Sequence, residues 1–238
     1  MTQKLLIFQS LWAMERRHTD GFERTLDENI AMIRQAGFDG ISAHYTNRRD
    51  VVLLNETLRG SGLKIEAVCF PRSVEDLRLP LELAAAFPVS HVNLQPDIRL
   101  RRVEACLPLL DGWMRLAEDA GIPVFIETHR DRMTTDLFFT LDLLDRRPEL
   151  PLLADLSHFL VGREFAFPVD EENHAHVRRV LQNAHAFLAS PHANRYRSKS
   201  PFRTTGPGSI SSRNGGTMVF AIGDPVPPMT PSWFLPAS

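Results

Sequence analysis

Cysteine is scarce in this sequence, and so are the features that mark secreted or membrane proteins. Cys69 and Cys106 are the only two cysteines among 238 residues, too few for a disulfide scaffold and without the spacing of a metal motif. Two buried thiols in a reducing cytoplasm are the simpler interpretation. No apolar run reaches eighteen residues, and no basic N-terminal segment leads into an apolar one. The sequence therefore predicts a cytoplasmic protein.

Excess charge of either sign is also missing. Lysine and arginine number 27 against 29 aspartates and glutamates, a net charge of −2. This balance gives no electrostatic reason to expect nucleic acid or a membrane surface as a partner. No dinucleotide fingerprint, phosphate loop or nucleophile elbow is present. We therefore expect no nucleic-acid or membrane partner, and a homo-oligomer stays open.

What the sequence does have is an alternation of short apolar runs with amphipathic segments. Seven runs predict strands, at 4–12, 38–45, 64–70, 91–96, 122–129, 150–158 and 185–190. Six segments between them have helical periodicity, at 27–36, 48–59, 73–87, 101–120, 134–146 and 171–184. Such alternation predicts parallel strands joined by helices. Seven strands in under 190 residues favour a (β/α)8 TIM barrel over a dinucleotide-binding sheet.

The chain changes character after residue 190. Residues 191–238 are rich in proline, glycine and serine, which predicts an irregular, poorly ordered tail. The barrel, residues 1–190, is then incomplete, with strand eight missing, and only Thr217–Gly223 in the tail could pass for a strand. A second hypothesis is a shift of reading frame near residues 190–200, because a neighbouring frame permits an amphipathic string over 213–226.

Two apolar runs end in the same way. The segment "PVFIETHRD" passes from a strand into Glu127, His129 and Arg130, and "PLLADLSHF" passes into Asp155 and His158. Because the chemistry of a (β/α) barrel lies where its strands end, these side chains should meet at one end of the barrel. His44, Asn93 and Gln95 also follow strand ends.

Each of these residues also has a structural explanation. Asp155 with Ser157 could cap the following turn. Glu127 with Arg130 could be a surface ion pair, worth at most about 1 kcal/mol. His129 and His158 could be packed, hydrogen-bonded histidines. The recurrence of acid and histidine at the ends of consecutive strands favours a functional site.

The segments "IETHRD" and "LADLSHF", at the ends of successive strands, resemble the xylose isomerase-like TIM barrel superfamily. This superfamily includes sugar phosphate isomerases/epimerases and AP endonucleases of family 2 type. The resemblance covers residues 1–190 and leaves the C-terminus atypical. It implies one divalent metal ion (Mn²⁺, Mg²⁺, Co²⁺ or Zn²⁺) held by Glu127, Asp155 and His192. A fourth ligand, a glutamate of strand eight, has no counterpart here.

The resemblance also implies an activity: isomerisation or epimerisation of a carbohydrate or sugar phosphate by proton transfer next to a carbonyl, through an enediolate. Glu127 is then the catalytic residue. His129, Arg130, His158 and His44 are expected to bind the substrate. Two alternatives stay open: a catalytically impaired barrel that lacks its last metal ligand, and a related dehydratase. Few histidines follow the strand ends, which argues against the three-metal DNA-repair branch.

Overall fold

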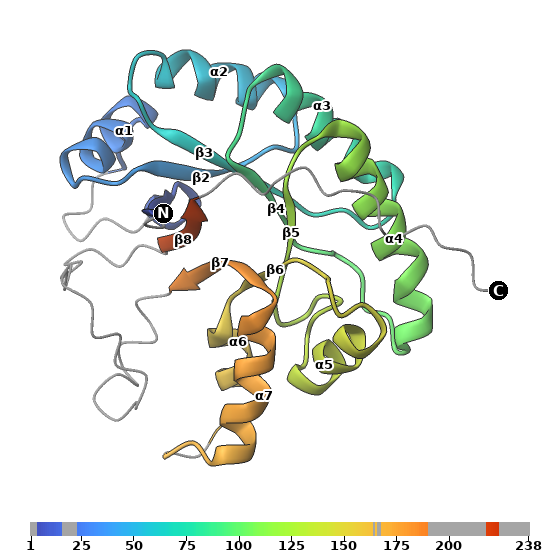
Figure 1. The fold of residues 1–238 in the computed structure, drawn as a ribbon. Coiled ribbons are helices and arrows are strands. Elements are labelled where there is room, and N and C mark those ends of the chain that lie inside the picture. Colours follow the sequence, from blue (N-terminus) through green and yellow to red (C-terminus); the bar gives the residue numbers. More distant parts are fainter. Residues whose placement is uncertain (1–3, 16–22, 164, 166–167, 190–217, 224–238) are drawn as a thin grey trace.

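The computed structural model describes residues 4–15, 23–163, 165, 168–189 and 218–223, and these form a closed barrel of eight strands (Figure 1). The strands are β1 (Lys4–Ser10), β2 (Gly40–His44), β3 (Lys64–Cys69), β4 (His91–Leu94), β5 (Val124–Glu127), β6 (Leu152–Ala154), β7 (Ala184–Ala189) and β8 (Met218–Gly223). Strands β1 to β7 pair in sequence order and in parallel. The seven predicted parallel strands are confirmed. The C-terminal ends of β1 to β7 lie at one end of the barrel, which we call the mouth.

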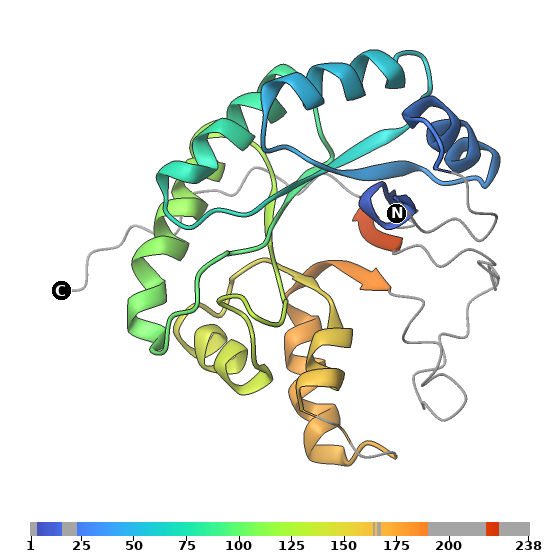
Figure 2. The same ribbon diagram turned by 180° about the vertical axis from the view of Figure 1, so that it is seen from behind.

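Helices form an arc on the outside of the strands from β2 to β6, as Figures 1 and 2 show. They are α1 (Leu26–Gln35), α2 (Arg48–Leu58), α3 (Arg78–Ala86), α4 (Val103–Ala120), α5 (Leu137–Arg146), α6 (Leu156–Gly162) and α7 (Glu171–Gln182), with short 3-10 helices at Trp12–Met14 and Glu75–Leu77. Helix α5 starts three residues later than expected, because the Asp136 side chain caps it by accepting from the main-chain N–H groups of Phe138 and Phe139. Helix α6, directly after β6, was not expected from the sequence.

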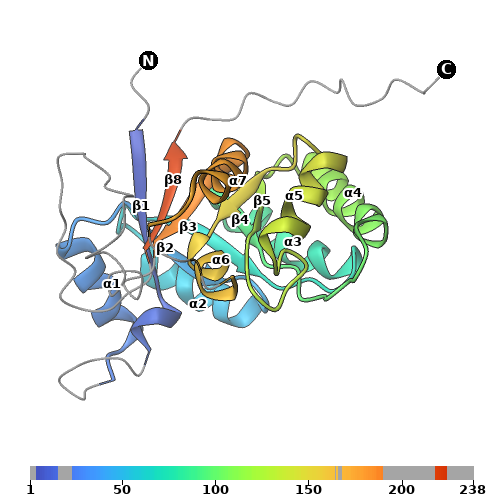
Figure 3. The ribbon, with the colours of Figure 1, turned by 90° about the horizontal axis from the view of Figure 1, so that it is seen from below.

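The eighth position of the barrel is filled by an antiparallel strand. Strand β8 pairs antiparallel with both neighbours, with Leu6 opposite Ala221 and Phe187 opposite Phe220 (Figure 3). A parallel eighth strand is absent from the described residues, so the barrel is incomplete as a (β/α)8 fold. Its two open edges are nevertheless covered by the one apolar segment of the tail, which needs no crossover helix in this direction. The rest of 191–238 lies outside the described residues.

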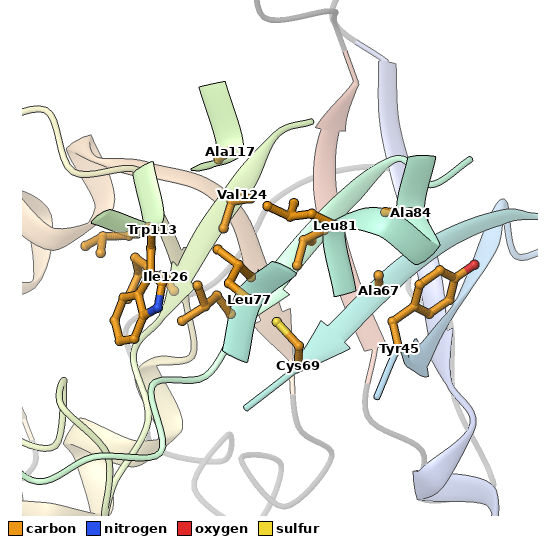
Figure 4. Packing of buried hydrophobic residues seen from close by; sticks show 14 of the residues in the cluster. Tyr45, Ala67, Cys69, Leu77, Leu81, Ala84, Trp113, Ala117, Val124 and Ile126 are labelled. Atoms are coloured by element: carbon orange, nitrogen blue, oxygen red, sulfur yellow. The ribbon is translucent and has the colours of Figure 1, made fainter. Parts of the chain in front are cut away.

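Side chains on the two faces of the sheet form two separate apolar clusters. The larger one lies between the sheet and the helices and includes Trp113 and Ile126 (Figure 4). The smaller one fills the barrel interior with Leu6, Phe8, Phe125, Leu153 and Ala186. Because side chains alternate along a strand, Glu127 shares the inward face of β5 with Phe125. The sheet therefore directs this carboxylate into the mouth.

Candidate functional site

Glu127 ends β5 as a deeply buried carboxylate. Only 1% of its surface is exposed. Its Oε2 accepts hydrogen bonds from Asn93 Nδ2 (2.5 Å) and Gln95 Nε2 (2.9 Å). Burial, and to a smaller extent the nearby Asp155 carboxylate, raise the pKa of Glu127 to about 8, although the two amides oppose the rise. A surface ion pair with Arg130 is therefore the wrong explanation, since Glu127 is buried and Arg130 is exposed.

The loop after β5 folds back onto the end of its own strand. Thr134 Oγ1 donates to the main-chain oxygen of Glu127 (2.6 Å) and accepts from the His129 main-chain N–H (3.1 Å). Within the loop, Nδ1 of the His129 ring lies 2.6 Å from the Arg130 main-chain oxygen. These bonds hold the His129 imidazole beside the strand end instead of letting it extend into solvent.

Asp155 follows β6 and is the N-cap of α6, which confirms the capping role that the sequence offered as one explanation. Its Oδ1 accepts from the main-chain N–H (2.9 Å) and the hydroxyl (2.6 Å) of Ser157. Its Oδ2 lies 3.3 Å from Nε2 of His158, one turn further along the helix. Burial raises the pKa of Asp155, and the Ser157 hydrogen bonds only partly offset it. Thr128 Oγ1 accepts from the Asp155 main-chain N–H (2.9 Å), which joins the two strand ends.

The imidazoles of His129 and His158 meet above Glu127. Their ring centroids are 3.9 Å apart with an interplanar angle of 45°. Burial lowers the pKa of each to about 4; the other imidazole adds to the effect on His129, and Arg130 adds to that on His158. Both rings are therefore neutral at pH 7. One ligand atom from each of Glu127, His129 and His158 lies within 4.8 Å of the others, which makes these residues the candidate metal cluster among the described residues.

The other site residues predicted from the sequence are not members of the Glu127–His129–His158 cluster. Asp155 is not one of these three residues, although its negative charge raises the pKa of Glu127. Arg130 is exposed, and its charge acts on His158. His44 is exposed at the end of β2 and packs edge-on against Phe70, with centroids 5.2 Å apart. His192 lies outside the described residues.

Sequence reasoning placed Asn93 and Gln95 at a strand end but gave them no role. The structure shows that both amides bind the Glu127 carboxylate. Their alternate positions in "HVNLQP" were the available signal, since alternate residues of a strand share a face. The signal becomes specific only once β4 is known to pair with β5, with Asn93 opposite Phe125.

A second polar set lies inside the barrel and was not foreseen. Ser42 Oγ donates to Glu66 Oε1 (2.7 Å), and His91 Nε2 lies 2.8 Å from Glu66 Oε2. Glu66 and His91 are 0% and 2% exposed. The negative charge of Glu66 contributes to the raised pKa of Glu127. This buried set therefore acts on the site through its electrostatic field.

Comparison with known proteins identifies the fold. No protein-family model matches the sequence, and comparison with curated proteins gives no match. Among solved structures, the probable 3-DHS dehydratase AsbF of Bacillus anthracis is 16% identical, with a TM-score of 0.57 over 88% of this chain and 82% of that one. A xylose isomerase-like TIM barrel protein from Mycobacterium smegmatis, in complex with magnesium, is 15% identical, with a TM-score of 0.53 over 76% of this chain and 74% of that one.

A third structure, protein SMc04130 from Sinorhizobium meliloti, is matched over only 64% of its own length, with 18% identity and a TM-score of 0.45. The likenesses above 0.5 show that this chain has the fold of xylose isomerase-like TIM barrels. At this level of identity they carry the fold alone. None of the helices that the structure describes is long and apolar enough to cross a membrane.

Proposed function

We propose that the protein is a divalent-metal-dependent isomerase or epimerase of a small carbohydrate, and that it transfers a proton next to a carbonyl group. The observation that carries this proposal is a buried carboxylate, Glu127, held by two amides and facing two neutral imidazoles at the mouth. A magnesium complex in one structure of the same fold supports a metal-dependent reaction.

The residues at the mouth fit a divalent ion. Glu127, His129 and His158 offer one carboxylate and two imidazoles, a mixed set suited to Zn²⁺, Co²⁺ or Mn²⁺ and less suited to Mg²⁺, which prefers oxygen ligands. A bound ion would supply Lewis-acid polarisation of the substrate carbonyl.

The protein's own groups account for the proton transfer and for substrate orientation. Glu127 is the buried carboxyl group placed to remove the proton next to the carbonyl and to return it. A pKa of about 8 keeps its proton affinity close to that of a base working near neutral pH. Asn93 and Gln95 fix the direction of the carboxylate. The exposed guanidinium of Arg130 could bind an anionic substituent such as a phosphate group.

A dehydratase is the second candidate, because one of the similar structures is a probable 3-DHS dehydratase. Isomerisation and dehydration can both begin with removal of a proton next to a carbonyl, and they differ in whether a hydroxyl group then leaves. An impaired barrel is the third candidate. The strand in the eighth position, "MVFAIG", contains no acidic residue and so supplies no carboxylate ligand.

The test is hydrogen exchange followed by proton NMR. The full-length protein is incubated in D₂O with Mn²⁺, Co²⁺ or Zn²⁺ and a panel of ketoses, aldoses and their phosphates, beside the Glu127→Gln variant. We expect deuterium to enter at the carbon next to the carbonyl, together with an isomer or epimer, in the wild type only. A product that has lost water would indicate the dehydratase. Exchange that persists in Glu127→Gln, or no exchange with any substrate, would overturn the proposal.

A further inference from the structure

Asn93, on β4, uses one half of its side-chain amide and leaves the other half without a partner. Its Nδ2 donates to Glu127 Oε2 at 2.5 Å. Its Oδ1 is buried and accepts no hydrogen bond within the part of the chain that the structure describes, and the residue is only 1% exposed. Gln95 binds the same carboxylate oxygen but is half-buried. A buried acceptor without a donor is unfavourable, so Asn93 Oδ1 calls for a ligand or a bound water that donates to it.

This free oxygen lies beside the carboxylate that we take as the base. The oxygen and nitrogen atoms of one amide group are about 2.2 Å apart, so Asn93 Oδ1 lies within roughly 5 Å of Glu127 Oε2. A base that removes a proton from a carbon lies about 3–3.5 Å from that carbon. A hydroxyl group on the same carbon is therefore within reach of Asn93 Oδ1.

The chemistry of the amide oxygen restricts what can bind there. An amide oxygen accepts hydrogen bonds and donates none. The ligand atom opposite it must carry a hydrogen, as the hydroxyl group of a sugar does and a ketone oxygen does not. A hydroxyl group that leaves, as in dehydration, needs a donor that protonates it, and Oδ1 supplies none. The free oxygen therefore suits a hydroxyl group that stays on the substrate.

A second buried oxygen without a partner lies at the end of β1. Ser10 is 1% exposed, and its Oγ has no hydrogen-bond partner among the described residues. Because side chains alternate along a strand, Ser10 shares the inward face of β1 with Leu6 and Phe8. It is the last residue of β1 and so lies at the mouth. Free oxygens on β1 and on β4 suit a ligand that carries more than one hydroxyl group.

We propose that Asn93 is a specificity-determining residue, whose Oδ1 accepts a hydrogen bond from the hydroxyl group on the carbon that loses its proton. The substrate is then an α-hydroxy carbonyl compound. The proton passes to Glu127, the C–H electron pair forms the carbon–carbon double bond of the enediolate, and the hydroxyl group keeps its bond to carbon. This inference rests on the proposed function, because it takes Glu127 as the base. It adds the substrate class and favours isomerisation or epimerisation over dehydration.

The test uses 1-deoxy-D-fructose, whose carbonyl group lies between a methyl group and a hydroxylated carbon, so that both carbons compete within one molecule. The full-length protein is incubated with it in D₂O with Mn²⁺, Co²⁺ or Zn²⁺, and proton NMR follows exchange at each carbon. We expect the wild type to exchange the hydroxylated carbon in preference to the methyl group. Asn93→Leu should lower the ratio of the two rates at least about tenfold, the effect of one lost hydrogen bond.

Gln95→Leu is the matched control. It removes the other amide from Glu127 Oε2, so both rates should fall together and their ratio should not change. Circular dichroism shows whether each variant is folded, and Asn93→Ala replaces Asn93→Leu if the leucine variant is not. The ratio, unlike either rate alone, does not respond to a residue that only orients the base.

The outcomes separate this inference from the proposed reaction. An equal ratio in wild type and Asn93→Leu overturns the inference, and Asn93 then only orients Glu127 or holds an ordered water. An equal fall of the ratio in Gln95→Leu also overturns it. Faster exchange of the methyl group in the wild type refutes the substrate class and leaves the proposed reaction standing. Lack of exchange at both carbons overturns the inference, and the proposed function falls with it only if the wider panel of sugars also fails to exchange.

Discussion

Replacing Glu127 with glutamine should stabilise the metal-free protein, and the gain should depend on pH. The folded state raises the pKa of this carboxyl from 4.5 to about 8, chiefly by burial. Between these values the folded protein holds a proton that the unfolded chain has lost, so stability falls as the pH rises towards 8. Glutamine cannot ionise, and its side-chain oxygen can still accept from Asn93 and Gln95.

The magnitude follows from the two pKa values. A difference of about 3.5, at about 1.4 kcal/mol for each pH unit, gives an upper limit of about 5 kcal/mol above pH 8. For a chain of this size about 1 kcal/mol corresponds to roughly 2–4 °C in the unfolding temperature, so the limit is roughly 10–20 °C. Below pH 4.5 the gain should disappear, because the carboxyl is then neutral in both states.

The assay is thermal unfolding by circular dichroism in the presence of a chelator, from pH 4.5 to 9. Glu118→Gln, at an exposed position of α4, is the matched control and should show no pH-dependent gain. Adding Co²⁺ should raise the unfolding temperature of the wild type and leave Glu127→Gln unchanged. The reasoning is refuted if Glu127→Gln is less stable than the wild type at pH 9, or if its gain is the same at pH 4.5 and pH 9.

Three further predictions concern the same fold. His129 and His158 should each contribute a loss of stability to the metal-free protein, of up to about 3 kcal/mol, as the pH falls from 6.5 to 4, because the unfolded chain takes up protons that these side chains exclude at a folded pKa of about 4. Glu127 acts in the opposite direction over this range, so urea unfolding of the wild type is compared with that of a variant with glutamine at both histidine positions, and the same pH dependence in the two proteins would contradict the prediction. Asn93→Asp should destabilise the metal-free protein at pH 8 relative to Asn93→Ala, because a second carboxylate would then face Glu127 at the position of its 2.5 Å donor; equal denaturation midpoints would count against this. Gly40→Ala should cost roughly 1–3 kcal/mol, since a Cβ there would lie 2.5 Å from the main-chain oxygen of Lys64 and from the Phe8 ring; an unchanged melting temperature would show that the strands yield.

The parallel strands could be predicted from sequence because the signal is local. Apolar runs of four to seven residues and helical periodicity between them appear wherever a βαβ unit forms. The direction of β8 has no such signal. "MVFAIG" is equally apolar in either direction, and its pairing depends on the free edges of β7 and of β1, the latter near the opposite end of the chain. Only the assembled barrel shows which way the segment runs.

The candidate site also contains residues that could be predicted from the sequence and a contact that could not. Glu127 and Asp155 could be found because an acid after an apolar run marks a strand end. The capping role of Asp155 was also open to prediction, since Asp followed by Ser at the second position is typical of a helix start. The contact between the rings of His129 and His158 could not be predicted, because it depends on Thr134 folding the loop back onto β5. Tertiary contacts that span a loop leave no period in the sequence.

The directions of the pKa shifts at the mouth differ from those of a network of ion pairs. In an ion pair, an opposite charge lowers the pKa of an acid and raises that of a histidine. Here the pKa values of both acids, Glu127 and Asp155, are raised and those of both histidines are lowered, each chiefly by burial. Every group is pushed towards its neutral form by burial, so these four side chains are not paired with one another as opposite charges. A divalent cation would favour ionised carboxylates and neutral imidazoles, so these directions agree with the ion that we propose at this mouth.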